Sequence, residues 1–279
     1  MLVVCLSRAR VVLAADRRVS YTNRSRPVDI ANKIVMFNQQ ALIGFTGIAS
    51  VDGQSTVSWI AKQARGLVTL NDLMAALERG ANEIGPRLLR FGRHGSLTLA
   101  VCYFAKPPGG SYTPCASVLT NSMNGVVSPD FRGYCKAHMK RDLVGVITLG
   151  HRLTADPSSR KRPEVALARG LRNSLRWRSP LGQSTGAGAA GATISAAIRR
   201  VAALSTGVGG DVMVASLLNP NFWHSSNQQS EFRYYPADAR DARQFSPILC
   251  GAGNETQFAY ATGDWTSRSS ELNPPKDLR

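Results

Sequence analysis

The most constraining feature of this sequence is a set of four short apolar runs within its first fifty residues, arranged as two pairs. Residues 2–6 and 11–15 are separated by a polar tetrapeptide. Residues 33–37 and 41–45 are separated by three polar residues. Runs of this length, rich in β-branched side chains, are too short for helices, and such short links are typical of hairpins. The chain is therefore predicted to begin with two β-hairpins.

The apolar pattern then changes to a helical period. From 54 to 64 and from 70 to 89, apolar residues recur at three- and four-residue spacing, with Asn71 as the candidate N-cap of the second helix. Further strands are predicted at 96–104, 115–120, 143–149, 211–217 and 231–235, and further helices at 163–172 and 193–204. Because runs of strands alternate with pairs of helices, we expect an α+β fold of antiparallel sheets covered by helix pairs.

Composition divides the chain near Pro220. The first 220 of the 279 residues are predicted to form one domain, long enough for a core of its own. Residues 221–279 are polar and rich in Gly, Ser, Asn and Asp, and are predicted to be a partly ordered C-terminal extension. Within the first part, residues 181–191 are almost entirely small or polar and predict a flexible loop.

The chain is strongly basic, with 34 Lys and Arg against 18 Asp and Glu and a net charge of +16. The cations are spread along the whole length in short clusters, which indicates a generally basic surface. Such a surface binds nucleic acid nonspecifically by releasing counterions. No helix-turn-helix or zinc-finger pattern accompanies it, so nucleic-acid binding is a third choice of function.

Cysteine and histidine usage predicts neither a metal site nor a cofactor. The five cysteines show no C-x-x-C spacing, and the four histidines lie far apart. The apolar start is too short for a secretory signal, and the longest uncharged stretch, 179–198, is too weakly apolar to span a membrane. A soluble, cytoplasmic protein is expected.

Three residues suited to chemistry fall at the ends of neighbouring predicted strands. Asp16 ends one strand, Lys33 begins another, and Gly47 follows a third. Charges at strand ends ordinarily face water and glycines ordinarily make turns. Here, however, an acid, a lysine and a Thr-Gly turn are expected to converge on one edge of a sheet.

Four motifs occur in a recognisable order: Ala14-Ala15-Asp16-Arg17-Arg18, Lys33, Gly44-Phe-Thr-Gly47 and Gly209-Gly210-Asp-Val-Met-Val. With them the chain resembles the proteasome β-subunits and bacterial proteasome-like peptidases among the N-terminal-nucleophile (Ntn) hydrolases. The resemblance is good over 1–66, weak in the middle and fair over 193–218. It implies a four-layer αββα sandwich, a homo-oligomer, and threonine-type hydrolysis of peptide or amide bonds.

In that family the first residue of the mature chain supplies a hydroxyl nucleophile and a free α-amine that accepts its proton. Carried over to this sequence, Lys33 is the charge partner of the nucleophile and Asp16 is the carboxylate that compensates Lys33. Gly47 supplies the N–H that stabilises the oxyanion. The resemblance also assigns supporting roles to Arg18, Thr46, Ser205, Gly209 and Gly210.

The sequence departs from the family at the nucleophile. Counting back from Asp16, the catalytic position falls at Met1 or just before it, and neither Met1 nor Leu2 carries a nucleophilic atom. Cys5 and Ser7 do not bear the free amine that the mechanism needs. Two explanations stay open: the chain starts upstream, or it is a non-catalytic structural or partner-binding subunit of an oligomer.

Overall fold

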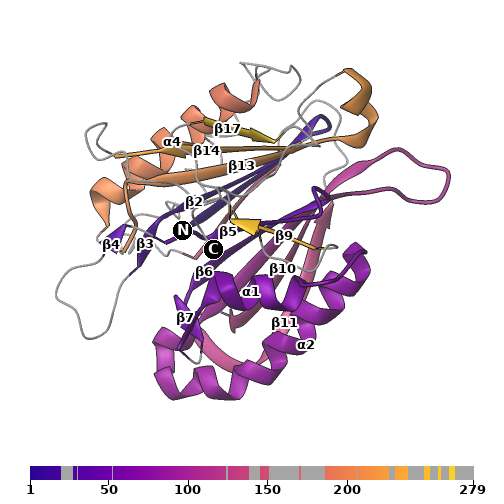
Figure 1. The fold of residues 1–279 in the computed structure, drawn as a ribbon. Coiled ribbons are helices and arrows are strands. Elements are labelled where there is room, and N and C mark those ends of the chain that lie inside the picture. The colour runs from indigo at the N-terminus through magenta and orange to yellow at the C-terminus, as the bar shows by residue number, and fades with distance from the viewer. Residues whose placement is uncertain are drawn as a thin grey trace.

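The computed structural model contains two large β-sheets (Figure 1). It describes residues 1–19, 28–29, 31–51, 53–123, 125–137, 145–150, 170, 186–205, 207–225, 230–237, 248–251, 257–258 and 264–267, and the statements below concern these residues. The six-stranded sheet has the order β12 (Gly145–Leu149), β1 (Leu2–Leu6), β2 (Arg10–Asp16), β13 (Val212–Leu218), β14 (Ser230–Tyr235) and β17 (Asp264–Ser267). The seven-stranded sheet has the order β11 (Val126–Ala137), β10 (Thr113–Met123), β9 (Leu97–Ala105), β6 (Ala41–Gly47), β5 (Ile34–Phe37), β15 (Ile248–Cys250) and β16 (Gln257–Phe258).

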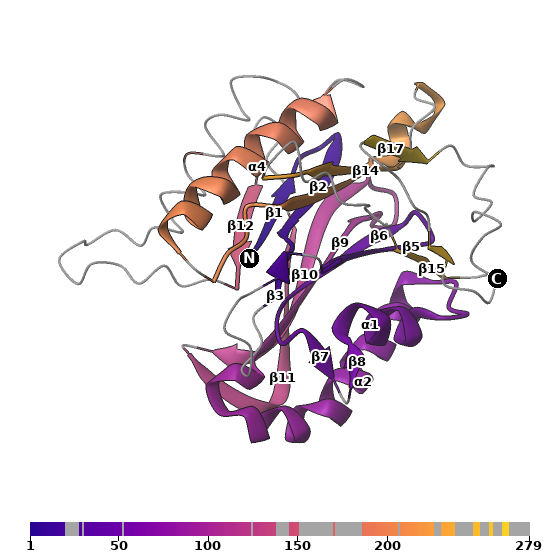
Figure 2. The ribbon, with the colours of Figure 1, turned by 60° about the vertical axis from the view of Figure 1, so that its left-hand side comes forward.

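Helices lie on the outer face of each sheet, as the turned view shows (Figure 2). Helices α1 (Thr56–Ala64) and α2 (Leu70–Leu88) pack on the seven-stranded sheet, and α4 (Gly186–Leu204) packs on the six-stranded one. The remaining elements are the ribbons β3 (Arg18–Val19) with β4 (Val28–Asp29) and β7 (Ser50–Val51) with β8 (Gln54–Ser55), and the 3-10 helices η1 (Leu89–Gly95) and η2 (Pro220–Ser225).

The inner strands are buried on both faces, which explains their continuous apolar runs. In β2, Leu13 contacts the cluster between the two sheets, whereas Val12 and Ala14 belong to the cluster beneath α4. All seven residues of β2 are buried. Because side chains alternate between the two faces of a strand, both sets must be apolar to exclude water. The exceptions, Arg10 and Asp16, lie at the two ends of the strand.

The predicted hairpins, the two consecutive helices and the mixture of helices with sheets are confirmed. The expectation of antiparallel sheets holds except at one place: β15 runs parallel to β5. The helix predicted at 163–172 lies outside the described residues, except that Gly170 is helical. The N-cap assignment to Asn71 is wrong, because the side chain of Thr69 accepts the N–H of Asp72 and caps α2.

The loop predicted at 181–191 is wrong for residues 186–191, which form the first turns of α4. The small residues there serve close packing: a Cβ on Gly191 would lie 2.5 Å from the hydroxyl of Tyr235. Ala190 is fully buried in the cluster beneath the helix. Composition alone does not separate a flexible glycine from one that lets two elements approach closely.

Strands from beyond residue 220 extend both sheets. β14 lies beside β13, and β15 lies beside β5. The division into 1–220 and 221–279 stays a prediction, but the described strands of the second segment, β14 to β17, belong to the two sheets. Among the described helices, none is long and apolar enough to cross a membrane.

The contact between α2 and β11 makes a testable prediction about two glycines of the same helix. A Cβ on Gly85 would lie 1.8 Å from the backbone oxygen of Pro129, whereas a Cβ on Gly80 would meet only the side chain of Gln63. Glycine to alanine in a helix ordinarily stabilises by about 1 kcal/mol. We expect Gly85→Ala to destabilise the protein by about 1–3 kcal/mol through overpacking.

The matched control is Gly80→Ala, because the flexible Gln63 side chain is able to move aside; we expect no loss of stability there. Urea denaturation of both variants measures the difference. Equal free energies of unfolding for the two variants would show that α2 does not approach β11 as described.

Candidate functional site

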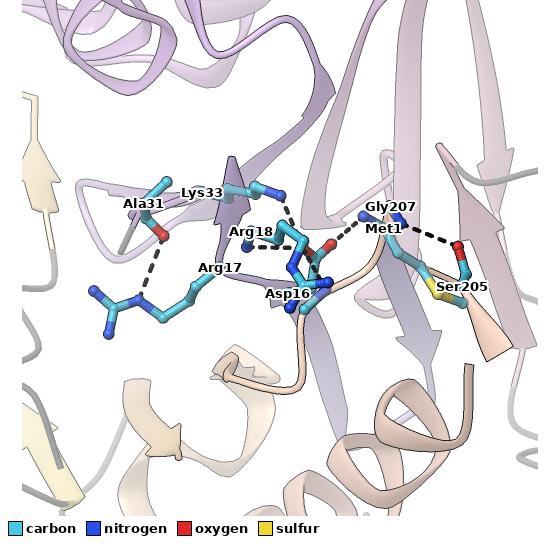
Figure 3. A network of polar contacts seen from close by, with 9 residues as sticks. Met1, Asp16, Arg17, Arg18, Ala31, Lys33, Ser205 and Gly207 are labelled. Atoms are coloured by element: carbon cyan, nitrogen blue, oxygen red, sulfur yellow. Dashed lines mark hydrogen bonds and ion pairs between the residues drawn. The ribbon is translucent and has the colours of Figure 1, made fainter. Parts of the chain in front are cut away.

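The register of the first hairpin brings its two outer ends together. Leu2 pairs with Ala15, which places Met1 opposite Asp16, and the N–H of Asp16 donates to the carbonyl of Met1 over 3.3 Å. The Asp16 side chain is fully buried. Its Oδ2 accepts a hydrogen bond from the α-ammonium of Met1, and its Oδ1 accepts one from Lys33 Nζ over 3.1 Å (Figure 3). The Asp16 carboxylate thus lies between two nitrogen donors, the α-amine of Met1 and Nζ of Lys33.

Two backbone N–H groups complete the environment of Asp16. The N–H of Arg18 donates to Oδ1 over 2.9 Å, and that of Gly209 donates to Oδ1 over 3.3 Å. Burial alone raises the pKa of a carboxyl group, but the charges of the Met1 ammonium and Lys33 outweigh it and lower the pKa of Asp16 to about 2. Asp16 is therefore an anion at neutral pH.

The α-amine of Met1 has the opposite balance. Burial disfavours its charged form, the charge of Lys33 adds to this effect, and the attraction of Asp16 opposes it only in part. The pKa of the amine falls from 8.0 to about 6. At pH 7 most molecules therefore carry a neutral amine, which still donates an N–H to Asp16 and keeps a lone pair able to accept a proton.

Lys33 is positioned by the start of the second hairpin. Its backbone carbonyl accepts the N–H of Phe45 over 3.1 Å, directly before β5 begins. The residue is buried, so its ammonium is directed into the molecule toward Asp16. The sequence motifs at Asp16 and Lys33 are thereby brought into direct contact, although 17 positions separate them.

Thr46 and Gly47 lie at the same end of the sheets. Gly47 has φ of 105°, and a Cβ there would lie 2.0 Å from the backbone oxygen of Ser96, so only glycine fits. A Cβ on Gly150 would lie 2.0 Å from the hydroxyl oxygen of Thr46. Because Leu149 pairs with Leu2, Gly150 follows at the ladder position next to Met1. Thr46 therefore packs close to the N-terminal end of β1.

The loop before β13 supplies one direct contact. Gly209 reaches Asp16 through its N–H, as described. The hydroxyl of Ser205 accepts the N–H of Gly207 over 3.2 Å, within the same loop. The carbonyl of Gly210 accepts a hydrogen bond from Arg199 of α4 over 3.2 Å. Ser205 thus bonds within its own loop and Gly210 bonds to α4, whereas Gly209 is the residue of this loop that donates to Asp16.

Two neighbours of the site were not identified from the sequence. Gly150 directly follows the predicted strand 143–149, and its closeness to Thr46 depends on how the two sheets pack. Arg17 lies within the Ala-Ala-Asp-Arg-Arg motif, but its contacts come from residues distant in sequence. Within the described residues, no group of three or more His, Cys, Asp or Glu side chains is placed to hold a metal ion.

The side chain at the amine carries no hydroxyl or thiol. Met1 is buried and belongs to the apolar cluster beneath α4, together with Val3, Ile198 and Val201. The arrangement at Met1 therefore provides a base, a charge partner and a carboxylate, but no nucleophilic atom.

The solved structures to which this chain is similar include the following two proteins. Anbu (ancestral beta-subunit) from Yersinia bercovieri shares 10% sequence identity with a TM-score of 0.46, over 83% of this chain and 86% of that one. Eukaryotic HslV from Trypanosoma brucei shares 16% identity with a TM-score of 0.34, over 78% of this chain and 99% of that one. Both are proteasome-type Ntn hydrolases, the group that the sequence motifs resemble.

No family model and no curated protein matches this chain. The identities and TM-scores of the two solved structures are low, so the function is inferred from the geometry of the site.

The lowered pKa of the α-amine makes stability depend on pH. Between about pH 8 and pH 6 the unfolded chain binds a proton at this amine and the folded protein does not, so stability rises with pH across this window. We expect the free energy of unfolding to increase by about 2 kcal/mol from pH 6 to pH 8. Urea denaturation at pH 6, 7 and 8 measures it.

The control is the same protein with its α-amine acetylated, which removes the titrating group and should flatten this rise. A wild-type free energy of unfolding that stays constant or falls from pH 6 to pH 8 would contradict the buried amine.

Proposed function

We propose that this chain is a proteasome-like Ntn-hydrolase-fold protein whose site is built to hydrolyse peptide or amide bonds. The observation that carries the proposal is the α-amine with its pKa lowered to about 6, held by the buried carboxylate of Asp16 beside Lys33. In the proposed fold, α1 and α2, the seven-stranded sheet, the six-stranded sheet and α4 are the four layers of an αββα sandwich.

The proposed reaction uses the amine as base. The hydroxyl or thiol of the N-terminal residue attacks the substrate carbonyl carbon while its proton passes to the neutral α-amine. The N–H of Gly47 stabilises the oxyanion, and Lys33 favours the ionised nucleophile by its charge. The protonated amine then gives its proton to the leaving amine, and water hydrolyses the acyl intermediate. Asp16 keeps the amine and Lys33 in place throughout.

This reaction needs a nucleophilic side chain on the residue that bears the amine. The proposal of activity therefore applies to a form of the protein whose N-terminal residue is Thr, Ser or Cys. For the form that bears Met1 at this position, we propose a non-catalytic subunit.

The non-catalytic role as an oligomer subunit is the second candidate function. Large apolar side chains are exposed at η1 and at the turn between β10 and β11: Phe91 is 55% exposed, Met123 51% and Val126 70%. Met123 and Val126 pair directly across the turn. Exposed apolar side chains of this size favour a protein partner, here a further copy of this chain. Size-exclusion chromatography with light scattering tests it, and a monomer near 30.1 kDa would contradict it.

Two measurements test the proposed hydrolase. Intact-mass analysis of the protein purified from its source identifies the N-terminal residue, and a panel of fluorogenic peptide amides then measures turnover. With Thr, Ser or Cys at the N-terminus we expect hydrolysis, and we expect Lys33→Ala to lower kcat/KM by about 10²–10⁴-fold. The loss follows because the charge that favours the ionised nucleophile is removed.

Lys62→Ala is the matched control, since Lys62 is an exposed lysine on α1 and should leave kcat/KM unchanged. Circular dichroism of both variants checks that they fold. An N-terminal Met1 or Leu2 excludes this mechanism, and full activity of Lys33→Ala would show that Lys33 has no part in it.

A further inference from the structure

Arg17 connects the two backbone segments that carry the charged residues of the site. It directly follows Asp16, and its backbone carbonyl accepts the N–H of Ala31 over 3.0 Å. Its side-chain Nε donates to the carbonyl of Ala31 over 3.5 Å (Figure 3). Ala31 lies two residues before Lys33. The position of Lys33 relative to Asp16 therefore depends on the link between Arg17 and Ala31.

A residue from beyond position 220 holds Arg17. The guanidinium of Arg17 lies 4.9 Å from the ring centroid of Tyr234 in β14. The hydroxyl of Tyr234 donates to the carboxylate of Asp211 over 2.9 Å, and the backbone carbonyl of Asp211 accepts the N–H of Arg17 over 2.9 Å. Tyr234 thus contacts Arg17 through its ring and is linked to the Arg17 backbone through Asp211.

Both side chains are almost completely buried: Arg17 is 3% exposed and Tyr234 is 6% exposed. A buried guanidinium needs partners that replace its hydration, and an aromatic face is one of them. Burial raises the pKa of Tyr234 to about 12, so its hydroxyl keeps its proton at neutral pH and donates to Asp211. Both contacts of Tyr234 are therefore present at neutral pH.

We propose that Tyr234 is a positioning residue of the candidate site: by holding Arg17 it fixes the distance between Asp16 and Lys33. This inference rests on the proposed hydrolase function and deepens it, because it gives the segment beyond residue 220 a part in the site. Tyr235, the next residue, is directed toward α4 and the cluster beneath it, and takes no part in this contact.

The variants separate the two contacts. Tyr234→Leu removes both the ring and the hydroxyl, Tyr234→Phe keeps the ring, and Tyr235→Phe is the matched control on the same strand. The first measurement is amide hydrogen exchange, which does not require the protein to be active. We expect the amide of Ala31, which donates to Arg17, to exchange at least tenfold faster in Tyr234→Leu than in the control, with Tyr234→Phe in between.

Exchange of the β6 and β9 amides should stay unchanged, which separates a local effect from general destabilisation. Equal exchange of the Ala31 amide in Tyr234→Leu and in Tyr235→Phe would overturn the inference, whether or not the protein hydrolyses amides. The second measurement applies where the wild type is active. We expect kcat to fall at least tenfold in Tyr234→Leu with KM within twofold, and partial recovery in Tyr234→Phe; a wild-type kcat in Tyr234→Leu would also overturn it.

Discussion

The buried carboxylate of Asp16 is the interaction on which the arrangement of this end of the molecule depends. It accepts hydrogen bonds from the α-ammonium of Met1, from Lys33 and from two backbone N–H groups. These donors come from the residue before β1, from the residue before β5, from the first residue of β3 and from the loop before β13. One side chain therefore links both sheets and the loop before β13. An uncompensated buried charge is costly, so these donors and the carboxylate require one another.

The same arrangement explains why the pKa of the amine and the pKa of the Asp16 carboxyl group are both lowered. At neutral pH this gives an amine that is able to accept a proton and a carboxylate that stays charged. Two nitrogens share one carboxylate, and all three groups are buried. Burial disfavours the charged form of the amine, the nearby Lys33 ammonium adds to this effect, and the pKa of the amine falls. A cation next to a neutral amine is the combination that a base-assisted nucleophile needs. The lowered pKa of the amine follows from its buried place beside Asp16 and Lys33, not from the side chain of the first residue.

The sequence allowed the prediction of elements in which local pattern and burial agree. The hairpins of β1 with β2 and β5 with β6 are continuous apolar runs with short links, and the motifs at Asp16 and Lys33 fall at their ends. By contrast, β11 was missed, because it lies at the edge of its sheet and its exposed residues, such as Arg132 and Lys136, break the apolar pattern. The start of α4 was missed because glycines that permit close packing look like glycines that permit flexibility.

The contact between Arg17 and Tyr234 was beyond sequence reasoning for a different reason. Both residues are ordinary in their local context, and 217 positions separate them. Their contact follows from strand order: Val212 of β13 pairs with Asp16 of β2 on one side and with Tyr235 of β14 on the other. In this register Tyr234 is level with Met213 and Ala15, so its ring reaches the Arg17 guanidinium diagonally across β13. Strand order depends on the whole chain. The segment around Tyr234 shows no motif of its own, and the topology of the sheet places this residue against the site.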